Sequence, residues 1–103
     1  MTYMRYYIRA GATTTAGGTV KSSSDFSVVE GVPLAREGDA VECPACGAQG
    51  RIECVLPRLA DAFEGRRYAL SDDLCMCECS PPPKLLADQD IEYQVLDAPG
   101  APG

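Results

Sequence analysis

Apolar residues along the chain come in short runs of three to six positions, which glycine or charged residues interrupt. No long window shows the i, i+3, i+4, i+7 spacing of an amphipathic helix. Short runs bounded by turn residues are typical of β-strands, so the pattern predicts a mostly β protein. The expected strands are residues 6–9, 18–21, 32–34, 40–43, 50–55, 68–69 and 74–79. Residues 57–63 could form one or two helical turns opened by proline.

The chain also resembles itself when it is shifted along its own sequence. At a shift of 34 positions, the Glu-Gly pair at 30–31 falls on the pair at 64–65. Three further matches at this shift are Ala35 with Ala69, Asp39 with Asp73, and Cys43 with Cys77. At a shift of 32, residues 18–22 fall on residues 50–54. The sequence therefore predicts a repeated β unit whose acidic turn leads into a cysteine.

The composition limits how much apolar core the fold can have. Of 103 residues, 18 are glycine or proline, and only 20 are Leu, Ile, Val or Phe. One domain at most fits this length. Domains shorter than about 70 to 80 ordered residues commonly need disulfides or a structural metal. The six cysteines are the obvious candidates for such a cross-link.

Charge and residue content exclude several classes of function. The net charge of −6 disfavours binding to nucleic acid or to anionic membranes. The chain contains no histidine, which rules out imidazole ligands and histidine general bases, and we expect no enzymatic activity. No run approaches the roughly 20 apolar residues of a membrane span, and no secretion signal is visible at the start. We therefore expect folding in a reducing cytosol, where neighbouring cysteines are typically metal ligands.

The cysteines form two groups that suit a metal site. Cys43-Pro-Ala-Cys46-Gly has the shape of a zinc knuckle, in which a turn directs two sulfurs at one ion. About 30 residues downstream, alternation along a strand would place Cys75, Cys77 and Cys79 on one face, and two of these three could complete a tetrahedron of thiolates. Cys54 is expected to be a small buried apolar residue. If the protein is exported and oxidised, the cysteines could instead pair as disulfides.

Other charged residues and the C-terminal segment have simpler interpretations. Asp39 and Asp73 are expected to cap turns, and Arg66, Arg67 and the pair at 72–73 to be solvated turn charges. After Cys79, a Ser-Pro-Pro-Pro run predicts a stiff exit from the fold. We place the folded domain at residues 5–87 and a flexible tail at residues 88–103.

Three segments of the chain resemble one known family. Residues 31–43 contain the tetrad Pro33-Leu34-Ala35-Arg36, residues 13–20 read TTTAGGTV, and residues 73–77 read DLCMC. In order and spacing these resemble the landmarks of the PAAR-repeat family, which is named for Pro-Ala-Ala-Arg. The resemblance covers about residues 11–80.

The resemblance implies an all-β fold, a small cone of short β-hairpins with pseudo-threefold internal repeats and a zinc ion near its apex. It implies that the cone sits as a monomer on the trimeric valine-glycine-repeat spike protein (VgrG) of a type VI secretion system. There it would sharpen the tip for puncturing an envelope and could carry effector proteins. The protein would be cytoplasmic before firing, would have no stable membrane anchor, and would be exported on the spike into the target cell or medium.

This chain departs from the family's usual zinc ligands. Members use mainly histidines with one cysteine, whereas here Ala16 stands where a histidine is expected and the second motif supplies Cys46. Cys77 matches the family's cysteine. A retained zinc ion would then be held by Cys43, Cys46, Cys77 and either Cys79 or Cys75. We choose Cys79, because this leaves Cys75 to point toward the core.

For the surface that meets the spike, we expect contacts from Val20, Val28, Val29 and Leu34. The alternative function is a zinc-ribbon type of protein-binding module unrelated to secretion. A ribbon that binds nucleic acid is disfavoured, because acidic residues such as Glu42, Glu53 and Glu78 surround the cysteines.

Overall fold

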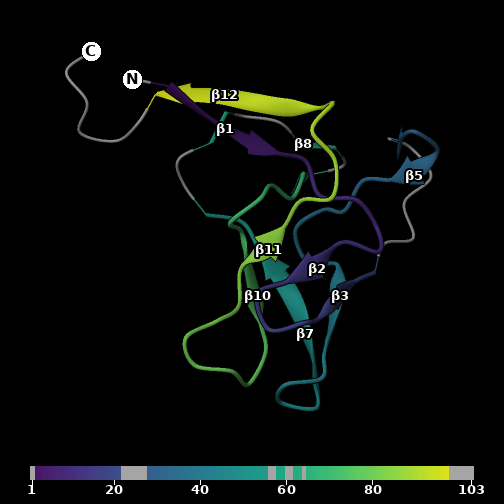
Figure 1. Ribbon diagram of the computed structural model, residues 1–103, viewed down its shortest axis with the longest axis vertical. Coiled ribbons are helices and arrows are strands. Elements are labelled where there is room, and N and C mark those ends of the chain that lie inside the picture. Colours follow the sequence, from purple (N-terminus) through teal and green to yellow (C-terminus); the bar gives the residue numbers. More distant parts are fainter. Residues whose placement is uncertain (1, 22–27, 56–57, 60–61, 64, 98–103) are drawn as a thin grey trace.

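The computed structural model is all-β over the residues it describes, which are 2–21, 28–55, 58–59, 62–63 and 65–97 (Figure 1). Its strands are β1 Thr2–Tyr6, β2 Thr13–Thr14, β3 Thr19–Val20, β4 Val28–Val29, β5 Val32–Pro33, β6 Ala40–Cys43, β7 Ala48–Glu53, β8 Ala62–Phe63, β9 Arg66–Arg67, β10 Leu74–Met76, β11 Leu85–Leu86 and β12 Tyr93–Asp97. The predicted fold class is confirmed. The helical turns considered for residues 57–63 are wrong at their C-terminal end, where β8 pairs with β9; residues 57 and 60–61 lie outside the described residues.

Six of the strands form an antiparallel sheet that nearly closes on itself. Its order is β10-β7-β6-β3-β2-β11. A β-bridge between Leu74 and Lys84 joins the first and last strands of this order, and the backbone N–H of Cys75 donates to the carbonyl of Pro83 at 2.8 Å. The sheet is therefore a small cone with side chains packed inside, not an open layer with two free edges.

A triangle of backbone hydrogen bonds lies at the centre of the fold. The N–H of Ile8 donates to the carbonyl of Ala69 at 3.0 Å, Ala69 donates to Ala35 at 2.9 Å, and Ala35 donates back to Ile8 at 2.8 Å. All three residues are fully buried. The chain therefore passes this point three times in equivalent ways. The structure thus has the pseudo-threefold symmetry that the family resemblance implied, whereas the internal matches of the sequence indicated only two copies.

The turns that follow the triangle repeat the same bonding. In each, an N–H donates to the carbonyl three residues earlier: Ala12 to Arg9, Asp39 to Arg36, and Asp73 to Leu70. The returning strands then bring in Val20, Ile52 and Leu85, which pack together in the core. Apolar residues at these equivalent positions explain how so few large side chains fill the interior.

Three two-stranded ribbons extend from the triangle toward the wide end of the cone: β4–β5, β8–β9 and β1–β12 (Figure 1). The first two are tight hairpins with a glycine in the turn, and Gly31 and Gly65 have positive φ angles of 80° and 76°. The third ribbon pairs the two ends of the described chain through five residue pairs, from Thr2 with Asp97 to Tyr6 with Tyr93.

Strand pairing therefore continues beyond residue 87, where the sequence placed the end of the folded domain. The expected tail includes β12. This strand packs against the rest of the fold, because its residues Gln94 and Leu96 are buried. Only Asp97 of the final residues 97–103 is described, as the end of this strand.

Two aspartates hold the repeat turns in the same way, which confirms their expected role as turn caps. Asp39 Oδ2 accepts a bond from the N–H of Arg36 at 2.8 Å, and Asp73 Oδ2 accepts one from Leu70 at 2.7 Å. Each carboxylate also meets an arginine of the next ribbon, Arg66 for Asp39 and Arg5 for Asp73.

The prediction that Asp73 is a solvated turn charge is wrong. Its side chain is 0% exposed and accepts hydrogen bonds from Arg5 at 2.7 Å and from Arg58 at 3.1 Å, both of whose side chains are also buried. The N–H of Val55 adds a further bond at 2.9 Å. A carboxylate with this many donors can be buried in its ionised form, and the ion pairs tie β1 to the third repeat.

Candidate metal centre

Three hairpin tips lie at the narrow end of the cone, opposite the ribbons (Figure 1). They join β2 to β3, β6 to β7, and β10 to β11. The second tip carries the knuckle cysteines Cys43 and Cys46, and the third begins with Cys77 and Cys79. Because the sheet closes between β10 and β11, residues far apart in the sequence meet at this end.

The structure brings four of the six cysteines together here. The sulfurs of Cys43, Cys46, Cys77 and Cys79 all lie within 4.8 Å of one another. Cys43 Sγ and Cys79 Sγ are 3.6 Å apart. Four thiolates around one zinc ion at 2.3 Å would be separated by about 3.8 Å in a tetrahedron, so the donor set and its spacing fit a single ion. A cluster with several metal atoms would need the sulfurs further apart.

Backbone groups support the knuckle. The N–H of Gly47 donates to the carbonyl of Cys43 at 3.0 Å, and Gly47 has a φ of 70°, a conformation that suits glycine at the end of such a turn. The N–H of Cys79 donates to Cys77 Sγ at 3.5 Å. These bonds fix the direction of the sulfurs before any ion arrives.

The electrostatic surroundings differ between the thiols. Burial raises the pKa of Cys46, but hydrogen bonds from the backbone N–H groups of Glu78 and Ala48 and from neighbouring thiols outweigh it and lower the pKa to about 7. The hydrogen bond with the Cys43 thiol, together with burial, raises the pKa of Cys79 to about 12. The tip thus favours the thiolate of Cys46, whereas a cation would be needed to ionise Cys79 at neutral pH.

Cys75 and Cys54 lie outside this group. Both are buried in the core cluster, and burial raises the pKa of each thiol to about 12. The expectation that Cys54 is a buried apolar residue is confirmed. Cys75 packs so closely on the neighbouring strand that a Cβ added at Gly50 would lie 2.8 Å from its sulfur.

Comparison with protein families identifies the chain. The PAAR motif matches residues 10–81, which is most of its length. The chain belongs to the PAAR motif family. Members are type VI secretion spike-tip proteins with a structural role. No curated protein and no solved structure matches the chain.

In this PAAR protein, the first hairpin tip contributes no sulfur. Ala16 stands at the position where the resemblance predicts a histidine. The tip is held by Thr14 instead, whose Oγ1 accepts bonds from the N–H of Gly18 at 2.9 Å and of Ala16 at 3.2 Å. The sequence alone did not single out Thr14, although threonine hydroxyls commonly form hydrogen bonds with nearby backbone groups in turns.

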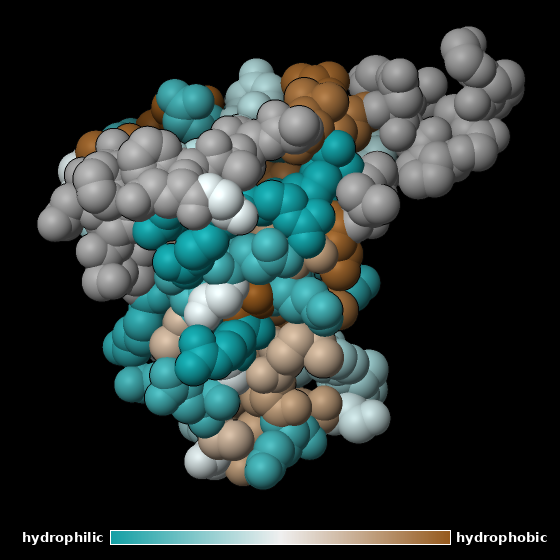
Figure 2. Space-filling model, turned by 180° about the vertical axis from the view of Figure 1, so that it is seen from behind, coloured by the Kyte–Doolittle hydropathy of each residue, from teal (hydrophilic) through white to brown (hydrophobic). Residues whose placement is uncertain are grey.

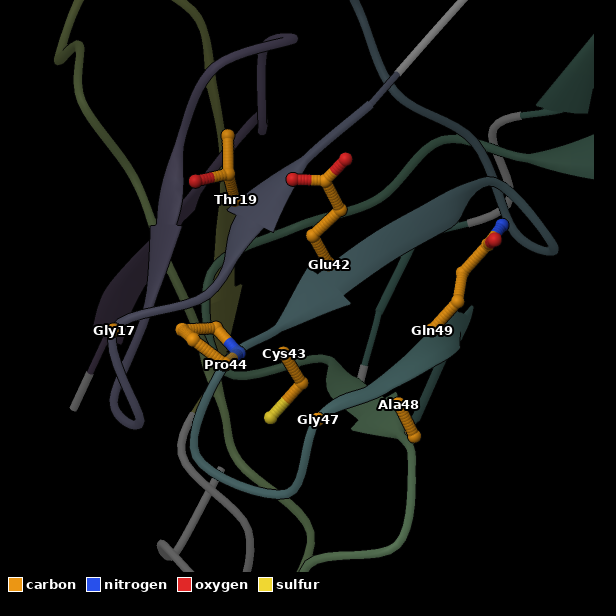
Figure 3. Close-up of a pocket in the computed structure, with 8 residues that line it drawn as sticks. All are labelled: Gly17, Thr19, Glu42, Cys43, Pro44, Gly47, Ala48 and Gln49. Atoms are coloured by element: carbon orange, nitrogen blue, oxygen red, sulfur yellow. The ribbon is translucent and has the colours of Figure 1, made fainter.

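A hollow of about 330 Å³ lies beside the thiols, between the first and second tips (Figure 3). It is lined by Gly17, Thr19, Glu42, Cys43, Pro44, Gly47, Ala48 and Gln49. Figure 3 shows the sulfur of Cys43 turned away from Thr19 and Glu42, toward the loop that leads to Gly47. Of the four clustered cysteines, Cys43 is the one that also lines the hollow.

Three of the four residues predicted to face the spike do not form an exposed surface. Val20 is 0% exposed in the core, because its inward position on β3 is equivalent to that of Ile52. Val29 and Leu34 pack with Tyr68 in a second buried cluster. Only Val28, which is 53% exposed, presents its side chain to solvent.

The described residues contain no helix long and apolar enough to cross a membrane.

Proposed function

We propose that this PAAR protein is a zinc-stabilised tip that caps and sharpens the trimeric valine-glycine-repeat spike of a type VI secretion system. The observation that carries the proposal is the position of the four clustered thiols, at the narrow end of a pseudo-threefold cone. A point that must resist force needs its loops tied together, and the thiols come from two different hairpins.

Zinc is the ion that this donor set favours. Four sulfur ligands in a tetrahedron select zinc over hard cations such as magnesium or calcium. When bound, the ion would supply a cross-link between the second and third tips, and structural zinc sites in small domains supply on the order of 10 kcal/mol of folding free energy. The ligands would be Cys43, Cys46, Cys77 and Cys79, which the backbone already directs at one point.

The wide end is the proposed surface for the trimeric spike. Its three ribbons follow the same pseudo-threefold arrangement as the backbone triangle, which suits the end of a trimer. Figure 2 shows apolar residues gathered at this end of the molecule. Exposed apolar side chains on two of the ribbons are Met4, Val28, Tyr93 and Val95. This set replaces the buried valines and leucine of the sequence prediction.

Binding to the spike is tested by co-purification of the chain with a spike trimer. We expect Val28→Glu and Val95→Glu to weaken recovery of the complex at least tenfold, because each puts a charge into a desolvated contact. Met76→Glu is the matched control, since Met76 is a similarly exposed apolar residue on β10, away from the ribbons. Equal recovery of all three variants would contradict the proposed surface.

Envelope puncture and effector delivery are the proposed consequences of this binding. A secretion assay that follows the chain and its effectors outside the producing cell tests them. We expect the Val28→Glu and Val95→Glu variants to remain folded, as shown by unchanged thermal unfolding, and to reduce secretion.

A further inference from the structure

The four clustered thiols bring together the tip between β6 and β7 and the tip between β10 and β11. In the described residues, no strand pairing joins these two tips. Cys43 and Cys79 lie 36 positions apart in the sequence, on the second and third tips, yet their sulfurs are 3.6 Å apart. A disulfide has a sulfur–sulfur distance of about 2.05 Å, so the two atoms need to approach by only about 1.5 Å. Small rotations of the two side chains in these loops can supply such a movement.

We propose that Cys43 and Cys79 form a site of disulfide formation that cross-links the two tips when the protein is metal-free in an oxidising medium. The second and third tips would then be cross-linked in both redox conditions. A metal ion would join them when the thiols are reduced, and a disulfide would join them when the thiols are oxidised.

The burial of the two thiols sets the order of the reaction. Cys79 is half-buried and open to a small oxidant, whereas Cys43 is 2% exposed. With oxidised glutathione, Cys79 attacks the glutathione disulfide as its thiolate, and one glutathione leaves and takes up the proton that Cys79 released. Cys43 then attacks the mixed disulfide at Cys79 in the same way, and the second glutathione leaves with the proton of Cys43. The two cysteines lose two protons and two electrons in total, and one oxidised glutathione becomes two reduced molecules.

The other two of the four clustered cysteines are also on different tips. Cys46 is on the second tip and Cys77 on the third, and their sulfurs lie within the same 4.8 Å group. A second disulfide between them would add to the same cross-link. By contrast, Cys54 and Cys75 are enclosed in the core and should remain reduced while the protein is folded.

The chemistry does not depend on the proposed function, but its consequence does. A spike tip moves from a reducing cytoplasm into surroundings that are commonly oxidising. If the metal is lost there, the disulfide would keep the second and third tips together.

The test treats the full-length chain, both zinc-loaded and after removal of metal with a chelator, with oxidised glutathione. Each disulfide lowers the intact mass by about 2 Da. Trypsin cleaves after arginine and lysine, so Cys43 and Cys46 fall in peptide 37–51, Cys54 in 52–58, and the remaining cysteines in 68–84. We expect a linked pair of peptides 37–51 and 68–84, with fragmentation placing the bond at Cys43 and Cys79. Bound zinc should slow this linkage at least tenfold.

Two variants make the assignment specific. In a Cys77→Ser background, which removes the possible bond between Cys46 and Cys77, Cys79→Ser should slow formation of the linked pair at least tenfold, and Cys75→Ser should leave its rate unchanged. Because a variant could fold poorly, the fragmentation of the wild-type linked pair decides independently. A bond confined to peptide 37–51, a bond to Cys54 or Cys75, or no change in mass would overturn the proposal. A chain that purifies without zinc would contradict the zinc site, while the peptide map would still decide the disulfide.

Discussion

The two ends of the cone are stabilised by different means. From the centre of the fold to the wide end, the backbone triangle, the ribbons and the ion pairs of Asp73 connect segments that are distant in the sequence. At the narrow end, the second and third hairpin tips are short loops whose main shared feature is the group of four thiols. Packing, hydrogen bonds and ion pairs thus connect the repeats where they converge, whereas the second and third tips meet at thiols that could hold a metal ion.

Loss of the metal should have the largest effect, and it should be confined to the narrow end. We expect a chelator, Cys46→Ser or Cys77→Ser to remove bound zinc and to open the second and third tips to solvent, while the backbone triangle and the ribbons keep the rest of the chain folded. Elemental analysis and hydrogen exchange measure this, with exchange rising first in residues 44–47 and 77–83. Cys75→Ser is the control and should keep its zinc. Loss of zinc from that variant would contradict the choice of ligands.

The next largest effect should come from the buried carboxylate of the wide end. Asp73→Asn leaves Arg5 and Arg58 buried without a counter-charge, which typically costs about 3 to 5 kcal/mol. The equivalent change Asp39→Asn breaks a pair with Arg66, whose side chain is 39% exposed, and should cost about 1 kcal/mol. Urea unfolding of both variants measures the difference. Equal losses would mean that the repeats are energetically equivalent despite their unequal burial.

A smaller effect should follow from loosening β12. The buried Gln94 accepts a bond from the N–H of Leu59 at 2.9 Å and donates to its carbonyl. Gln94→Ala would leave these backbone groups without their partner, at a cost of about 1 to 3 kcal/mol. Thermal unfolding measures it against Gln49→Ala, an exposed glutamine near the narrow end, which should change little. An unchanged unfolding temperature in Gln94→Ala would show that β12 adds little to the fold.

The smallest effect concerns pH. A hydrogen bond from Arg67 holds the pKa of Glu37 below its usual value. A carboxyl whose pKa is lowered by folding adds stability above its unfolded pKa, near 4.3, and that stability is lost as pH falls through the folded pKa. Glu37→Gln should therefore be less stable than the wild type at pH 6 by under about 1 kcal/mol, and equally stable near pH 2. Since any zinc lost in acid is lost from both proteins, their difference isolates this pair. A difference that persists at pH 2 would contradict the assignment.

Much of the architecture could be predicted from local patterns. The short apolar runs predicted strands, and residues 40–43 were located with their observed bounds as β6. The shift of 34 positions matched residues that the structure makes equivalent, because Ala35 and Ala69 occupy equivalent corners of the backbone triangle. The spacing of the cysteines also indicated which ones could meet, but the strand expected over residues 74–79 ends at Met76. Cys77 and Cys79 therefore reach the other two sulfurs from the loop beyond β10, and not by alternation along a strand.

What the sequence did not predict depends on contacts between distant segments. The first repeat carries Ile8 where the others have alanine, so its equivalence is visible only in the hydrogen bonds. The pairing of β1 with β12 joins the two ends of the described chain, and no local signal marks such a partner. Val20 and Val28 look alike in the sequence, yet one faces the interior of the cone and the other faces solvent.

The ribbon formed by β1 and β12 has a consequence for how the chain could be rearranged. It occupies the place that a hairpin occupies in each of the other two repeats. The three repeats therefore form a ring, and the two ends of the described chain meet in the ribbon of the third repeat. A circular permutant that links Asp97 to Thr2 with a short turn and begins at Gly31 or Gly65 would trace the same ring from a different starting point. The order in which the units are synthesised is therefore separable from the shape they make.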